Sequence, residues 1–197
     1  MSLETTLSRI AEIRAALAPP APPAQSESGP SFASVLQGAA GPAAQISGAT
    51  PAAGGGGALN AARGEVGVAE QPPGSNDGPR IAEYRRAVPG GPVGPWCAYF
   101  VSWCARQAGT PLGENGQGYA SVSQVWAWAQ RTGRAVPNGP GVRPQAGDLI
   151  VWGGRHIGIV EGVLPDGRVQ TIEGNSSDRV SRRVHPPGSA TGYVRLG

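Results

Sequence analysis

The sequence predicts an α+β fold, in which helices at the start of the folded region pack on an antiparallel sheet of five to six strands. Four helical patterns come first along the chain, at residues 58–66, 79–87, 96–108 and 121–132. Five strand patterns follow, at residues 148–152, 156–160, 168–172, 179–184 and 192–196. Turn signals separate the strands, notably Pro165-Asp166-Gly167 and Gly174-Asn175. Helices grouped ahead of strands are typical of an antiparallel sheet that packs against a helix layer.

The composition separates a folded domain from a segment that cannot build a core. The chain of 197 residues holds 32 glycines and 20 prolines, which is close to the range of low-complexity sequence. Residues 19–57 are rich in proline, alanine, glycine and serine, and we predict that they form a disordered linker. All five tryptophans lie beyond residue 58. Residues 58–197 are long enough to bury a core of ordinary size and are predicted to form one domain.

Ahead of the linker, residues 1–18 are predicted to form one short amphipathic helix. Leu3, Leu7 and Ile10 recur at spacings of three and four residues, and Pro19 ends the pattern. A helix this short is marginal alone in water, so the segment either packs on a partner or is a frayed tail. The apolar island at residues 32–36 (FASVL), inside the linker, is likewise either a docking motif or a chance cluster.

Charge and hydropathy exclude two classes of partner. The formal net charge is +3 and the lysines and arginines form no run, so we predict no nucleic-acid partner, which would need a concentrated basic stripe. The weak positive excess either suits an anionic polymer such as a cell wall or is ordinary surface charge.

No apolar run reaches the length of about 18 residues that a membrane span needs. Charged residues such as Glu4 and Arg9 interrupt the apolar core of a signal peptide, so we predict no signal peptide.

Two cysteines, Cys97 and Cys104, lie in the helical pattern at residues 96–108. A helix separates them by about 10.5 Å, whereas a disulfide needs Cα atoms within about 7 Å, and their spacing matches no common zinc site. Pro95 favours a helix start, so Cys97 falls in the first turn, where free N–H groups and the helix dipole stabilise a thiolate and could hold an oxyanion. Cys97 is therefore either a nucleophile or a buried structural thiol, and Cys104 is predicted to be a core residue.

Of the two histidines, His156 is the candidate base. It opens an apolar strand and shares a face with Gly158, whose missing side chain leaves open space beside it. The next strand ends in Glu173 and Asn175, and a hairpin would bring either one within hydrogen-bonding range of the imidazole. The alternatives are a structural histidine and ordinary turn chemistry for the other two residues. His185 precedes two prolines and is predicted to be a surface residue in a loop.

The order of cysteine, histidine, glutamate and asparagine resembles that of the CHAP family, the cysteine, histidine-dependent amidohydrolases/peptidases. The matching pieces are residues 95–103 (PWCAYFVSW), 146–151 (AGDLIV), 156–160 (HIGIV) and 172–175 (IEGN). The stretch from Glu65 to Asn76 also resembles that family's entry helix and loop. The resemblance covers about 140 residues, and four pieces in the right order make it specific.

The resemblance implies a papain-like fold and hydrolysis of amide bonds in bacterial peptidoglycan. The bond is either in the stem or cross-bridge peptides or at the muramic acid–alanine link. The implied roles are nucleophile for Cys97, general base for His156, third member for Glu173 and supporting polar group for Asn175.

Two positions depart from the family pattern. Trp96 stands where many relatives have glutamine, which puts the oxyanion donor in doubt. Residues 90–94 (GGPVG) lack the acidic calcium loop of some relatives, so we predict no metal and no cofactor.

The N-terminal piece resembles, more faintly, the starts of actinobacterial wall hydrolases associated with flagella. This implies a flagellar or secretion apparatus as the partner of residues 1–57, and an extracytoplasmic location reached by a non-classical route. The alternatives to an amidohydrolase are a catalytically inert wall-binding module, an acyltransferase, and a docking element whose N-terminal half carries the function.

Overall fold

The computed structural model describes residues 55–197. The predicted helix at residues 1–18 lies outside the described residues, as do residues 19–54 of the predicted linker. In the described part, four helices precede a sheet of six strands, and every neighbouring pair of strands is antiparallel. The predicted α+β class is therefore confirmed. None of the helices within residues 55–197 is both long and apolar enough to cross a membrane.

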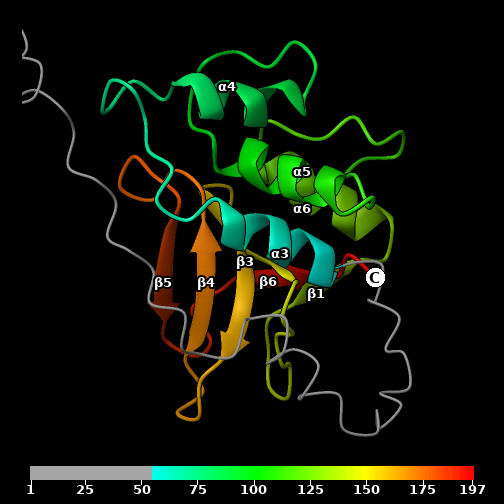
Figure 1. Ribbon diagram of the computed structural model, residues 1–197. Helices are drawn as coiled ribbons and strands as arrows, with labels where there is room; N and C mark the ends of the chain where they lie inside the picture. The colour runs from blue at the N-terminus through cyan, green and yellow to red at the C-terminus, as the bar shows by residue number, and fades with distance from the viewer. Residues whose placement is uncertain (1–54) are drawn as a thin grey trace, which may run out of the picture. The chain divides into compact units, whose positions relative to one another are not determined.

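The elements follow the predicted order, and the helices lie on one side of the sheet (Figure 1). The helices are α3 (Gly55–Gly64), α4 (Pro79–Arg86), α5 (Cys97–Gln107) and α6 (Val122–Arg131). The strands are β1 (Ala135–Pro137), β2 (Leu149–Trp152), β3 (His156–Val163), β4 (Val169–Glu173), β5 (Ser181–His185) and β6 (Gly192–Val194). The strand order in the sheet is β1-β6-β2-β3-β4-β5, so β5 is an edge strand and β3 and β4 are neighbours.

Alternate strand residues face two separate apolar cores. Ile157, Ile159 and Ile172 pack with the helices in the main core, as the two-residue period of a strand requires. Intervening residues such as Val160 join a smaller cluster with Tyr193 on the other face of the sheet. Helix α5 forms the centre of the main core, because most of its residues are buried.

The boundary between the linker and the domain lies earlier than predicted. Gly55, Gly56 and Gly57, which the sequence assigns to the linker, form the first turn of α3. A glycine run is typical of a flexible linker, but here close packing decides. A Cβ at Gly57 would lie only 2.9 Å from the Cβ of Ala108, so glycine lets α3 approach the end of α5.

One strand has no counterpart among the five strand patterns of the sequence. β1 is three residues long and pairs only with β6, through Ala135, Val136 and Pro137. A segment this short carries too few residues to show a two-residue period. The sheet therefore has the larger of the two predicted strand counts.

Candidate active site

Helix α5 begins at Cys97, so this residue lies in the first turn of the helix, as the sequence predicts. Trp96 is its N-cap residue and provides no side-chain hydrogen bond to the helix start. The first intrahelical bond runs from the Phe100 N–H to the Trp96 carbonyl, so the N–H groups of the first turn are left to other acceptors. Cys97 is 5 % exposed. The residue is therefore buried, and it lies at the positive end of a helix, which favours a negative charge.

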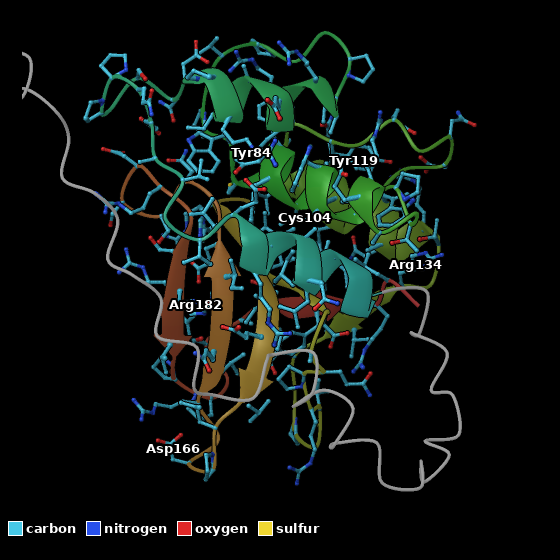
Figure 2. All side chains as sticks on the ribbon, viewed as in Figure 1. Tyr84, Cys104, Tyr119, Arg134, Asp166 and Arg182 are labelled. Carbon is cyan, nitrogen blue, oxygen red and sulfur yellow. The ribbon has the colours of Figure 1, made fainter. Side chains whose placement is uncertain are left out.

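Both cysteines are free thiols, as their spacing predicts. Cys104 is fully buried two turns further along α5, and Figure 2 shows it inside the helix layer. Burial raises the pKa of the Cys104 thiol well above its usual value. Cys104 is therefore an inert core residue, and Cys97 is the candidate for chemistry.

The end of β4 lies directly against the first turn of α5. A Cβ at Gly174 would lie 2.5 Å from the Cβ of Phe100 and 2.9 Å from the indole ring of Trp96. No side chain fits into that space, because non-bonded carbon atoms normally stay about 3.5–4.0 Å apart. Glycine at this position therefore holds the strand end that carries Glu173 beside the helix end that carries Cys97.

His156 joins the thiol and the carboxylate. Its Nε2 lies 2.8 Å from Oε2 of Glu173, and the Cys97 thiol lies close enough to its ring to raise the pKa of the imidazole. Because Nε2 faces the glutamate, Nδ1 is the nitrogen left to face the sulfur. The structure thus brings together three of the residues that the sequence singles out, in the order thiol, imidazole and carboxylate.

The charges of this group reinforce one another. Burial lowers the pKa of His156, but its hydrogen bonds with Cys97 and Glu173 outweigh burial and raise that pKa to about 9. Burial raises the pKa of Glu173, but hydrogen bonds from His156, Thr171 and His185 outweigh burial and lower it to about 2. At neutral pH the glutamate is therefore ionised and the imidazole carries the proton, so a positive charge lies between the carboxylate and the sulfur.

Gly158 makes room for the side chain of Glu173, whereas the sequence predicted open space at this position. The sequence suggests open space beside His156, but the side chain of Glu173 fills it. A Cβ at Gly158 would lie 2.6 Å from Cγ of Glu173. β3 and β4 pair so that Ile159 lies opposite Ile172, which puts Gly158 across from Glu173. The glutamate therefore crosses over the glycine to reach the imidazole.

Asn175 makes no hydrogen bond with the imidazole in the described structure. Its backbone is left-handed, with φ 54°, and its Nδ2 donates a hydrogen bond to Oδ1 of Asn76 at 3.0 Å. Of the two candidates at the end of β4, Glu173 is thus the partner of His156. Asn175 instead connects the strand end to the loop between α3 and α4.

A buried carboxylate that the sequence did not single out holds the residue before Cys97. Glu70 is 3 % exposed and accepts hydrogen bonds from Trp96 Nε1 at 2.8 Å and from the Asn76 N–H at 2.8 Å. The indole N–H is therefore committed to the interior and cannot serve as an oxyanion donor. This leaves the backbone N–H groups of the α5 start for that task.

The prediction for His185 is wrong. It is the last residue of β5 rather than part of a loop, and its side chain is only 26 % exposed. Its Nε2 lies 2.5 Å from Oε1 of Glu173, where Thr171 Oγ1 also donates at 2.6 Å. A pair of prolines after a histidine gives no signal for such a contact, because it depends on the pairing of β5 with β4.

Within residues 55–197, no group of three or more histidine, cysteine, aspartate or glutamate side chains has the arrangement of a metal site. The polar side chains around Glu173 are joined by hydrogen bonds.

Comparison with known families matches the centre of this arrangement. Residues 89–175 match the model of the CHAP domain, and this segment includes the start of α5, the strands β2 to β4 and the residues Cys97, His156 and Glu173. Comparison with curated proteins and with solved structures finds no match. Residues 89–175 are thus similar to a CHAP domain, and CHAP domains are generally amidases and peptidases.

Proposed function

We propose that this domain hydrolyses amide bonds in the peptides of peptidoglycan, with Cys97 as nucleophile and His156 as the residue that accepts and returns the proton. Two observations carry the proposal: the hydrogen bond between His156 and Glu173, and the closeness of the Cys97 thiol to the same imidazole, whose pKa it raises. A wall-binding module would need none of these three groups in contact. The family match supports the substrate class.

The first half-reaction begins with the thiolate that the helix start and the imidazolium stabilise. The sulfur attacks the carbonyl carbon of the substrate amide, and the carbonyl oxygen becomes an oxyanion. The backbone N–H groups at the start of α5, which have no side-chain cap, receive that oxyanion. His156 then gives its proton to the leaving amine, and a thioester with Cys97 remains.

The second half-reaction reverses these roles. Neutral His156 takes a proton from a water molecule, which attacks the thioester and releases the acid product together with the Cys97 thiolate. Glu173 keeps Nε2 of the imidazole engaged, so that Nδ1 faces the reacting atoms in both half-reactions. Its ionised state also stabilises the imidazolium. Glu173 therefore orients the imidazole of His156 and stabilises its protonated form without touching the substrate.

We assign Asn175 a supporting role of a different kind. Its hydrogen bond to Asn76 joins the turn after β4 to the loop before α4. That loop also holds Trp96 through Glu70. The asparagine therefore stabilises the wall beside Cys97 and leaves the orientation of the imidazole to Glu173.

We also propose that the enzyme works outside the cytoplasm, where peptidoglycan lies. Export by a non-classical route, and a flagellar or secretion partner for residues 1–57, stay predictions from the sequence.

The test compares three variants of the full chain on purified cell walls. C97A and C97S should lose the release of muropeptides, which mass spectrometry of the soluble products measures. C104A is the matched control, because it removes a thiol from the same helix at a fully buried position, and it should keep the activity. Undiminished lysis by both Cys97 variants would rule out the nucleophile, and binding without cleavage by the unaltered chain would favour a wall-binding module.

A further inference from the structure

The Glu173 carboxylate is hydrogen-bonded to two imidazoles, one at each of its oxygens. His156 bonds Oε2 at 2.8 Å and His185 bonds Oε1 at 2.5 Å. The proposed mechanism uses only the first of them. His185 also lies outside the matched residues 89–175, so the family match says nothing of its role.

We propose that His185 is a positioning residue of the active site, whose Nε2–H fixes the plane of the Glu173 carboxylate so that Oε2 faces the imidazole of His156. This inference rests on the proposed function, since it assigns a task within the same Cys97–His156–Glu173 relay. An ionised carboxylate accepts hydrogen bonds only, so His185 is the donor in this contact.

Thr171 alone cannot fix the carboxylate in this way. Its hydroxyl donates to the same Oε1 at 2.6 Å, but it also lies 3.4 Å from the carbonyl of Arg183. A hydroxyl rotates to suit its acceptor, whereas the N–H of an imidazole points in one direction once its ring is held. The rigid donor therefore sets the direction of Oε1, and with it the direction of Oε2.

The ring of His185 is itself held in place. Its centroid lies 4.4 Å from the indole of Trp152, and the pairing of Val169 with His185 fixes its place on β5. Trp152 also stacks on His156, with centroids 5.7 Å apart and planes inclined by 26°.

These contacts close a ring of four side chains, each from a different strand. Trp152 comes from β2, His156 from β3, Glu173 from β4 and His185 from β5. The ring passes from indole to imidazole to carboxylate to imidazole and returns to the indole. Removal of one member therefore loosens the orientation of the other three, the base His156 among them.

The test separates the hydrogen bond of His185 from its ring packing. H185Q keeps an N–H donor at the ε position and loses the ring, whereas H185F keeps a ring beside Trp152 and loses the donor. We expect H185F to lower kcat on cell walls by about tenfold with little change in KM, because one hydrogen bond to a charged group is lost. H185Q should stay within about threefold of the unaltered chain.

A second readout does not depend on the substrate. The rate at which iodoacetamide alkylates Cys97 near neutral pH, followed by mass spectrometry of the Cys97 peptide, should fall in H185F and recover in H185Q. If the unaltered chain does not cut walls, the proposed function fails, and the alkylation series still decides the role of His185.

Three outcomes would overturn the inference. Unchanged alkylation and kcat in H185F would show that the carboxylate needs no donor from β5. Equal losses in both variants, or a larger loss in H185Q, would show that ring packing rather than the hydrogen bond matters. Unfolding curves show whether both variants fold. If H185F does not fold, H185Q alone decides the test. A large loss of kcat and of alkylation rate in H185Q would then contradict the inference, because this variant keeps the N–H donor.

Discussion

Replacement of Gly158 by alanine should disable the site without touching any of its reactive groups. The new Cβ would lie 2.6 Å from Cγ of Glu173 and 3.2 Å from the Ile172 carbonyl oxygen. Carbon atoms in contact stay about 3.5–4.0 Å apart, so the glutamate side chain must move by about 1 Å. A movement of that size breaks the 2.8 Å bond to His156. Misplacement of a catalytic group by about 1 Å costs on the order of 10²-fold in rate, which we expect for kcat in G158A.

The control for this substitution lies on the same strand. A Cβ at Gly162 meets no heavy atom within 4 Å, so G162A should keep both the activity and the alkylation rate of Cys97. Overpacking at residue 158 should also lower the free energy of unfolding by about 1–3 kcal/mol, which urea titration measures at a temperature where both variants stay folded. A kcat of G158A within a factor of three of G162A would refute the reasoning, because the carboxylate would then not need the space above residue 158.

Three further predictions concern charge and burial. The imidazolium of His156 is the acid of the mechanism and its pKa is raised to about 9, so hydrolysis should fall as the pH rises through about 9; a pH–rate profile that falls already near pH 6.5 contradicts this. E173Q removes the negative charge beside that imidazolium. We expect kcat to fall on the order of 10²-fold and the alkaline limb of the pH–rate profile to move to lower pH. A pH–rate profile of unchanged shape would contradict this. W96F leaves buried Glu70 without its indole donor and should cost about 1–3 kcal/mol of unfolding free energy by urea titration. The matched control is W103F, because the Trp103 N–H makes no hydrogen bond within residues 55–197; equal losses in the two variants would argue against a special role for the indole donor.

Local chemistry let the sequence single out the thiol and the imidazole of the relay. Cys97 follows a proline at a helix start, and His156 opens an apolar strand, so each carries its signal in its own neighbourhood. From the residues alone the choice between Glu173 and Asn175 stayed open, because a sequence does not show which of the two lies across from Gly158; only the family resemblance favoured Glu173. The β3–β4 register settles it in favour of Glu173.

His185 and Glu70 could not be found from the sequence for a related reason. The contact of His185 depends on how the edge strand β5 pairs with β4, and its two following prolines indicate only that a strand or loop ends there. Glu70 looks like any charged loop residue until Trp96 is placed beside it. Polar residues that act through a distant partner leave no periodic pattern, whereas the apolar residues of β3 and α5 repeat at the spacing of their element.

Two glycines decide which polar residues meet. Gly174 lets the end of β4 touch Trp96 and Phe100, and Gly158 leaves room for the glutamate on β4 to cross β3. A carboxylate at residue 175 could not replace Glu173, because the backbone there has turned to φ 54° and directs its side chain to Asn76. The relay therefore depends on the two glycines, which have no side chain, as well as on the positions of the thiol, imidazole and carboxylate. For this reason, substitutions at residues 158 and 174 should disturb catalysis more than changes at most of the exposed arginines around the sheet.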